Sequence, residues 1–277
     1  MSHFTVLVKI RGKEHMDNIE WALHDILESY SENLEVEPYP DENLTPERIQ
    51  QDLGDLIQRI CSNDCPDYLE SYKKNKDLLK KVFWEMKDNW EEFLKNEQLL
   101  DKFNKVYENY YGKPLESDGK MYTTYNPESK WDWWSIGGRW SGQFILKDGA
   151  TGLEGSPGVF DNKTGIDVAL AKDIDWDKMK EINKEAATEN YHNSKEKPFS
   201  GVLPDESLED YLDRISRFYT YAVLDEEEGW HERGRMGWFA CVYDADESEE
   251  EWAKKFEERF LKDLDDDIIL VVVDCHI

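Results

Sequence analysis

Residues 268–277 read Ile-Ile-Leu-Val-Val-Val-Asp-Cys-His-Ile, a run in which β-branched side chains dominate. Such a run predicts a strand that is buried on at least one face. Side chains alternate between the two faces of a strand, so Asp274 and His276 share one face and Cys275 lies on the other. The last ten residues therefore place two polar groups side by side on an otherwise apolar strand.

The first residues of the chain also predict a strand. Apolar side chains occupy every second position of residues 4–10, which indicates one strongly apolar face. If this strand pairs antiparallel with residues 268–277, His3 lies beside Asp274 and His276, because opposed residues are ~4.5–5.5 Å apart at Cβ. The three side chains then either satisfy one another by hydrogen bonds or serve as ligands of a zinc or manganese ion.

Residues 130–142 hold four of the chain's 11 tryptophans and read Lys-Trp-Asp-Trp-Trp-Ser-Ile-Gly-Gly-Arg-Trp-Ser-Gly. Tryptophan is large and hard to bury fully, and a glycine pair allows positive φ or a close approach of the backbone. The stretch is therefore either a corner packed by aromatic rings or a platform for a flat ligand. Its candidate ligand-binding residues are Trp133, Trp134, Arg139 and Trp140.

A second candidate binding segment is residues 230–238, Trp-His-Glu-Arg-Gly-Arg-Met-Gly-Trp. Arginines on a glycine-flanked turn bind phosphate or carboxylate, and a tryptophan face stacks on a nucleobase with ~1–3 kcal/mol. If the two segments meet, Arg139 becomes a third donor. The alternative is arginine stacked on tryptophan without a ligand, through cation–π contacts of ~0.5–2 kcal/mol. The candidates here are His231, Glu232, Arg233 and Arg235.

Further strands are predicted at residues 140–147, 219–224 and 236–243, the last two as a hairpin. Helices are predicted at residues 167–186 and 248–264, and the second begins with the capping box Ser248-x-x-Glu251. The resulting fold is α+β, with a mostly antiparallel sheet, adjacent first and last strands, and helices packed on it.

The middle of the chain predicts a helical insertion. From Thr45 to Tyr111 apolar residues recur at helical spacing, and aromatic side chains at that spacing are typical of a packed core. Residues 1–38 and 113–277 are expected to form the α+β core domain, and residues 39–112 the insertion.

The charge balance is strongly acidic, with 62 acidic and 34 basic residues and a formal net charge of −28. Such a charge repels nucleic-acid backbones and anionic membranes, so neither direct nucleic-acid binding nor membrane binding is expected. It is compatible with simple solubility, with mimicry of a nucleic acid, or with capture of a partner that has a basic surface.

Sequence motifs do not indicate a reaction. The chain has no Gly-x-Ser-x-Gly elbow, no His-Glu-x-x-His zinc motif and no phosphate loop, so no catalytic residue is predicted. No cofactor is predicted either, although a nucleotide or a divalent metal stays open as a ligand. The four cysteines include only one close pair, and the start lacks the features of a signal peptide, which favours a cytoplasmic protein with reduced thiols.

Several segments resemble a family of bacteriophage and prophage proteins. They are Met-Ser-His-Phe-Thr-Val-Leu-Val at the start, Trp-Asp-Trp-Trp-x-x-Gly-Gly-Arg-Trp at residues 131–140 and Val-Asp-Cys-His-Ile at the end, with further likeness at residues 172–176 and 230–238. The resemblance covers the first ten residues and roughly residues 121–277, and the helical segment departs from it. It implies a phage gene expressed in a bacterial cytoplasm, without implying an activity.

These observations lead to two hypotheses about function. The first is a phage-encoded accessory protein that binds a bacterial host protein with a basic surface, such as a defence factor, through its acidic surface and inserted helices. The alternative is a nucleotide-binding protein or nucleotide-processing enzyme that uses the tryptophan and arginine residues. The first does not require catalysis and agrees with the missing catalytic motifs.

Overall fold

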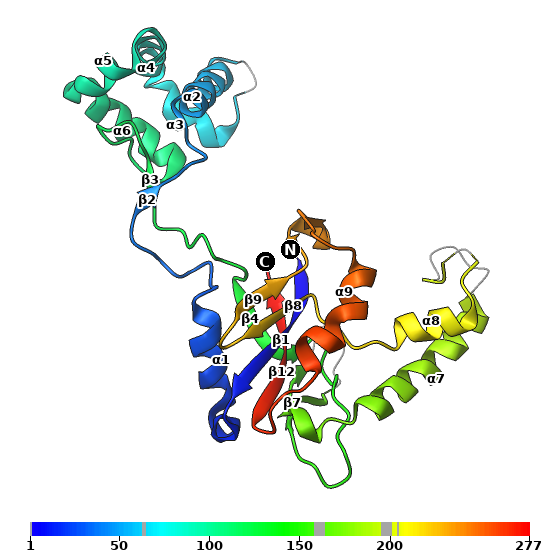
Figure 1. Cartoon of the computed structure of the whole chain (residues 1–277). Helices are drawn as coiled ribbons and strands as arrows, with labels where there is room; N and C mark the ends of the chain where they lie inside the picture. The colour runs from blue at the N-terminus through cyan, green and yellow to red at the C-terminus, as the bar shows by residue number, and fades with distance from the viewer. Residues whose placement is uncertain (1, 63–64, 158–163, 195–200, 204) are drawn as a thin grey trace. The chain divides into compact units, whose positions relative to one another are not determined.

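The computed structural model describes residues 2–62, 65–157, 164–194, 201–203 and 205–277 (Figure 1). The chain forms two compact units, a core unit of residues 1–34 and 126–277 and a helical unit of residues 35–125. The helical unit thus includes residues 35–38 and 113–125, which the sequence assigned to the core. Its two ends are joined by a short antiparallel pair of strands, β2 (Tyr39–Pro40) and β3 (Tyr122–Thr123).

The core unit is built on a mixed, mostly antiparallel sheet with the strand order β5-β7-β12-β1-β8-β9. β4 pairs with the C-terminal half of β12 and with β6, whereas β7 pairs with the N-terminal half of β12. The strands are β1 (His3–Arg11), β4 (Trp133–Gly138), β5 (Leu153–Glu154), β6 (Ser156–Pro157), β7 (Ile166–Leu170), β8 (Ala222–Asp225), β9 (Gly229–Glu232) and β12 (Ile268–His276).

The prediction that the first and last strands are adjacent in the sheet is confirmed. β1 and β12 are antiparallel from the pair His3 and His276 to the pair Arg11 and Ile268. All nine residues of β12 are buried, because β1, β4 and β7 flank the strand and helices cover both of its faces. The α+β class is likewise confirmed, and β8 adds a parallel pairing with β1.

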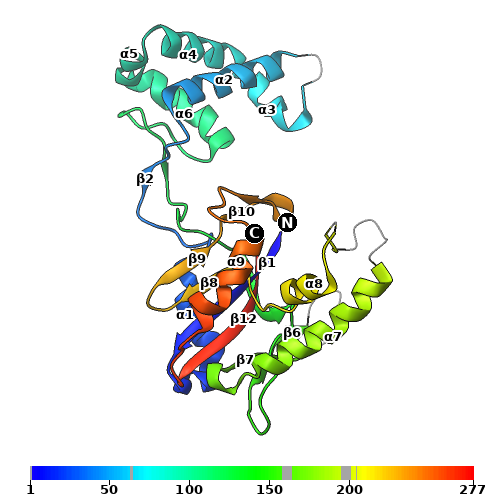
Figure 2. The ribbon, with the colours of Figure 1, turned by 45° about the vertical axis from the view of Figure 1, so that its right-hand side comes forward.

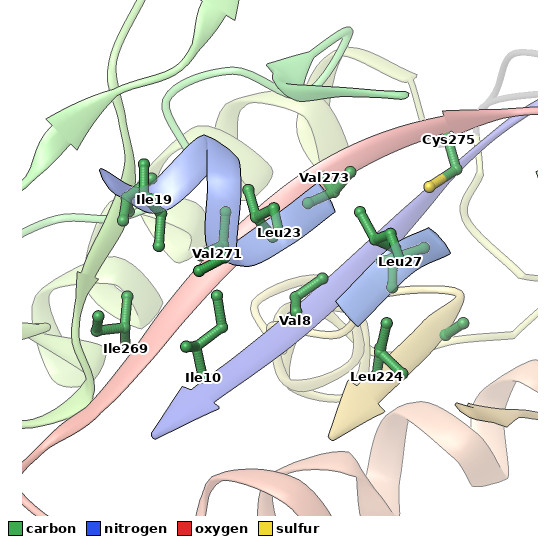
Figure 3. Packing of buried hydrophobic residues seen from close by; sticks show 14 of the residues in the cluster. Val8, Ile10, Ile19, Leu23, Leu27, Leu224, Ile269, Val271, Val273 and Cys275 are labelled. Carbon is green, nitrogen blue, oxygen red and sulfur yellow. The ribbon is translucent and has the colours of Figure 1, made fainter. Parts of the chain in front are cut away.

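Helices cover both faces of this sheet (Figure 1, Figure 2). On one face, α1 (Ile19–Glu28) packs its apolar side on β1, β8 and β12, as Figure 3 shows for Leu23 and Leu27. On the other face, α9 (Glu249–Phe256) and its π-helical continuation η5 (Glu257–Leu261) pack three aromatic side chains on the sheet, Trp252, Phe256 and Phe260. Each fully buried large apolar side chain contributes ~1.5–3 kcal/mol, so this three-layer core holds the two termini of the chain in place.

The remaining elements of the core unit connect these layers. They are η1 (Lys13–Asn18), η3 (Ala171–Asp173), α7 (Trp176–Ser194), α8 (Leu208–Ile215), β10 (Arg235–Met236), η4 (Trp238–Ala240) and β11 (Val242–Tyr243). α9 begins at the predicted capping box, in which Ser248 and Glu251 cap each other's backbone N–H groups.

Two predicted strands are wrong. Residues 140–147 contribute only an isolated bridge from Leu146 to Ile174, because Gly137 and Gly138 adopt positive φ and turn the chain before residue 140. Residues 236–243 do not pair with residues 219–224. β8 instead pairs with β9, because Gly229 adopts a φ of 82° and closes the hairpin early.

The start of the predicted helix at residues 167–186 is also wrong. Residues Ile166–Leu170 form β7, and the helix begins at Trp176. A short apolar run such as Val168-Ala169-Leu170 fits a buried strand as well as a helix, so periodicity does not distinguish the two.

The helical unit has its own hydrophobic core, with Phe93, Phe103 and Tyr107 almost completely buried. The side chains of Thr45, Asn89 and Asn96 cap the starts of α2, α5 and α6. Its helices are α2 (Pro46–Cys61), η2 (Asp67–Leu69), α3 (Glu70–Lys73), α4 (Lys76–Asp88), α5 (Trp90–Lys95) and α6 (Glu97–Tyr111). Across the residues described in both units, no helix is long and apolar enough to span a bilayer.

Candidate functional site

The strongest polar cluster lies where β1 begins and β12 ends, near the two termini in Figure 1. His3 Nδ1 lies 2.8 Å from Asp274 Oδ1, and His276 Nδ1 lies 2.6 Å from Asp132 Oδ1. An ionised carboxylate only accepts hydrogen bonds, so each imidazole donates its Nδ1–H. The two rings are 4.9 Å apart, and the side chains of His3, His276 and Asp274 are at most 8% exposed.

Trp133 covers this cluster. Its ring stacks on His276 at 5.1 Å and meets the edge of His3 at 5.1 Å. The structure therefore shows two hydrogen-bonded pairs, His3 with Asp274 and His276 with Asp132, whose imidazole rings are in contact. Among the described residues, no group of three or more histidine, cysteine or acidic side chains could hold a metal ion.

The glycine pair beside this cluster is explained by two buried carboxylates. Asp274 Oδ2 accepts the Arg139 N–H at 2.9 Å, and a Cβ on Gly138 would lie 2.4 Å from Asp274. A Cβ on Gly137 would lie 2.4 Å from Asp167 Oδ2. The chain thus approaches both aspartates more closely than a side chain at either glycine would allow.

Asp167 organises the loop that follows the glycine pair. Its carboxylate accepts hydrogen bonds from the backbone N–H groups of Gly142 and Gln143, at 2.9 and 3.0 Å, and from Ser141 Oγ at 2.9 Å. Burial raises the pKa of Asp167, although the hydrogen bonds from Gln143, Gly142 and Ser141 act in the opposite direction. No local pattern in the sequence predicts this role for Asp167, because an aspartate within a strand has no distinguishing signal.

The four tryptophans of residues 130–142 do not form one platform. Trp131 is buried and donates its Nε1–H to the Leu27 carbonyl at 3.1 Å. Trp134 packs on the core beneath α1, and Trp140 is half-buried. Trp133 is 42% exposed, and one face of its ring stacks on His276. Packing on the core therefore accounts for Trp131 and Trp134, and ligand binding at Trp133 and Trp140 stays a prediction.

The second candidate segment begins in the edge strand β9, and Arg233 and Gly234 form a bend before β10. Trp230 packs at 5.2 Å from Tyr30 and donates its Nε1–H to Glu232 at 2.8 Å, and Glu232 also pairs with Lys130 at 2.9 Å. Trp230 and Glu232 lie on one face of β9. His231 lies on the other face, because side chains alternate along a strand. Arg233 lies 3.4 Å from Glu249, and the exposed Arg235 lies 3.6 Å from Asp244.

The two candidate segments touch through the pair of Lys130 and Glu232, but their other candidate side chains lie on separate strands. β4 and β9 are separated by β12, β1 and β8, so Trp133 and Arg139 are far across the sheet from His231 and Arg233. The condition for a joint site with Arg139 as a third donor is therefore not fulfilled. Ligand binding by either segment alone stays a prediction.

The opposite end of the sheet has a concentrated negative charge. Two acidic segments meet there, the turn between β8 and β9 and the connection from η5 to β12. We call this surface the acidic end, and it comprises Asp225, Glu226, Glu227, Glu228, Asp263, Asp265, Asp266 and Asp267.

Arg11 joins the two segments of the acidic end. Its guanidinium lies 2.8 Å from Asp265 and 3.5 Å from Glu227, and its backbone N–H donates to Glu226 at 3.1 Å. Lys9 pairs with Asp225 at 2.5 Å. Burial acts to raise the pKa of Asp225, but hydrogen bonds from Lys9 and two backbone N–H groups outweigh it and hold that pKa below its ordinary value.

The acidic character of the chain is evident in its composition, but this surface is not, because the two segments are about 35 residues apart. They converge because β8 ends and β12 begins at the same end of the sheet.

No protein-family model, curated protein or solved structure matches the chain. The molecule is thus defined by its fold, an α+β core with helices on both faces of the sheet and an inserted helical unit.

Proposed function

We propose that this chain is a phage-encoded accessory protein that binds a basic surface of a bacterial host protein, as an inhibitor of a host defence component. The observation that supports this mode of binding most is the acidic end. The phage setting rests on the resemblance of residues 131–140 and of both chain ends to phage and prophage proteins.

The acidic end has a large surplus of negative charge. Lys9 and Arg11 are already paired within it, and most of the carboxylates are exposed, with Glu227 and Glu228 at 71% and 70%. A focused potential of one sign speeds encounter with a partner of the opposite sign and penalises partners of like charge. A basic protein surface is therefore favoured, and a nucleic-acid backbone is repelled.

The helical unit offers a second type of contact. Tyr68 is 69% exposed and Trp84 is 56% exposed, and the ammonium of Lys87 lies 5.2 Å from the Trp84 ring. Tryptophan and tyrosine are enriched among residues that dominate binding energy in protein interfaces. We assign these side chains to apolar anchoring and the acidic end to charge recognition.

The test is affinity capture from bacterial host lysate with three forms of the full chain. One is the parent, one replaces Glu226, Glu227 and Glu228 by glutamine, and the matched control replaces the exposed Glu181, Glu185 and Glu189 of α7 by glutamine. Both variants lose the same charge, so solubility effects cancel.

We expect a host protein that the parent and the α7 control capture and that the Glu226–Glu228 variant loses. Its capture should weaken steeply with added salt, because surface charge attraction is screened over roughly 8–10 Å at physiological ionic strength. Identical capture by all three forms, or capture insensitive to salt, would contradict the proposal.

A further inference from the structure

A cavity of about 600 Å³ opens between α7, the residues after α8, and α9 with η5. Its volume is in the range of small-molecule sites in proteins. Three acidic side chains line it, Asp213, Glu257 and Glu258. Five basic side chains also line it, Lys180, Lys184, Arg217, Lys254 and Lys262. Lys180, Arg217 and Lys262 pair with the three lining carboxylates and Lys254 pairs with Glu250, so the cations of the lining exceed its acids by two in a chain whose net charge is −28.

The floor of this cavity is aromatic. Trp176 and Phe218 line it with their ring centroids 5.3 Å apart, and both rings are half-buried. Phe218 is fixed from behind by Phe144 and Phe256, at 5.8 and 6.1 Å. Held in this way, the rings present a preformed apolar surface to a ligand.

Arg217 has a nitrogen that lacks a partner. Its Nη2 pairs with Asp213, whereas Nη1 is one of two buried side-chain nitrogens in the described residues that make no hydrogen bond. Nη1 itself is inaccessible, but the Arg217 side chain is 20% exposed and lines the cavity, so its guanidinium can meet an acceptor bound there. Because the donor is a guanidinium, an anion such as a phosphate group fits best.

The backbone at this place is irregular. The Lys262 N–H donates to the Glu257 carbonyl at 2.9 Å, which is the i to i+5 bond of a π-helical turn. Such turns in helices are frequent at functional sites. Glu257, Glu258 and Leu261 of this turn all line the cavity.

We infer that this cavity binds a small ligand of the nucleoside-phosphate class. Arg217 and Lys184 contact the phosphate groups, and the base packs on Trp176 and Phe218. A long nucleic acid is disfavoured, because it would extend beyond the five cations onto the acidic surface, whereas a mononucleotide fits within them. This site is separate from the acidic end, so either proposal can fail without the other.

The test is isothermal titration of the full chain with ADP, inorganic pyrophosphate and adenosine. Arg217→Gln and Lys184→Ala remove phosphate contacts. Lys178→Ala is the matched control, because Lys178 is an exposed lysine of the same helix that does not line the cavity. Lys184 is exposed as well, so its replacement should leave the melting temperature unchanged.

We expect ADP to bind more tightly than pyrophosphate or adenosine, since only ADP contacts both the cations and the rings. Arg217→Gln and Lys184→Ala should each weaken ADP binding about tenfold or more, and Lys178→Ala should not. Absence of ADP binding, or equal binding in all variants, would overturn the inference. Pyrophosphate binding as tight as ADP, or preference for a single-stranded oligonucleotide, would overturn the assigned ligand class.

Discussion

Replacing Asp274 is the sharpest perturbation of the cluster at the joined termini. The carboxylate is 2% exposed and accepts two hydrogen bonds, from His3 Nδ1 at 2.8 Å and from the Arg139 N–H at 2.9 Å. Asp274→Ala leaves both donors buried without an acceptor. Hydrogen bonds to charged groups contribute ~1.5–3 kcal/mol each, and breaking a buried pair from one side typically costs ~3–5 kcal/mol.

Asp274→Asn separates the loss of charge from the loss of shape. The amide oxygen still accepts from the Arg139 N–H, and the amide nitrogen donates to His3 Nδ1 once the imidazole adopts its other tautomer. We therefore expect about 3–5 kcal/mol lost for alanine and about 1–2 kcal/mol for asparagine.

The assay is native-state hydrogen exchange of peptides from β12, read by mass spectrometry as the free energy of opening. β12 is buried along its whole length, so its amides report the opening of the core unit. If Asp274→Ala lowers the free energy of opening by less than about 1 kcal/mol, or if the alanine and asparagine variants lower it equally, the hydrogen-bond account of this cluster is refuted.

Three further outcomes are expected. Gly138→Ala puts a Cβ 2.4 Å from Asp274 at a φ of 53° and should lower core stability by ~1–3 kcal/mol; an unchanged melting temperature would contradict the close approach. Phe103→Ala should lower the free energy of opening of α6 peptides by ~3–5 kcal/mol, measured by hydrogen exchange, and leave that of β12 peptides unchanged, because the units have separate cores. Equal losses in both sets of peptides would argue against separate cores. Asp225 has a lowered folded-state pKa, so its stabilising contribution is present above the ordinary carboxyl pKa and is lost as the pH falls through the folded value. The stability gap between the parent and Asp225→Asn, from melting curves, should therefore be largest near neutral pH and close in acid; a constant gap would contradict the ion pair with Lys9.

Strong local patterns made part of the fold predictable. Residues 4–10 and 268–277 are both apolar at strand spacing, and their pairing brought His3 beside Asp274 and His276 as expected. The capping box at Ser248 set the start of α9. In these places the local preference and the tertiary packing agree.

Other features depend on contacts distant in sequence. β7 was mistaken for the start of a helix because its apolar run is short, and β9 was missed because a polar edge strand lacks an apolar pattern. Asp132 and Asp167 gain their roles only from the segments that fold around them. The buried nitrogen of Arg217 likewise depends on how α7, α8 and α9 pack, which no spacing in the sequence reports.

The most direct test of the proposed function is hydrogen exchange of the full chain with and without its captured host partner. We expect slower exchange in residues 225–228 and 263–267, the two segments of the acidic end, and no change in the β1–β12 pairing that lies inside the core. Protection confined to other surfaces, with both acidic segments exchanging as in the free chain, would contradict recognition through the acidic end.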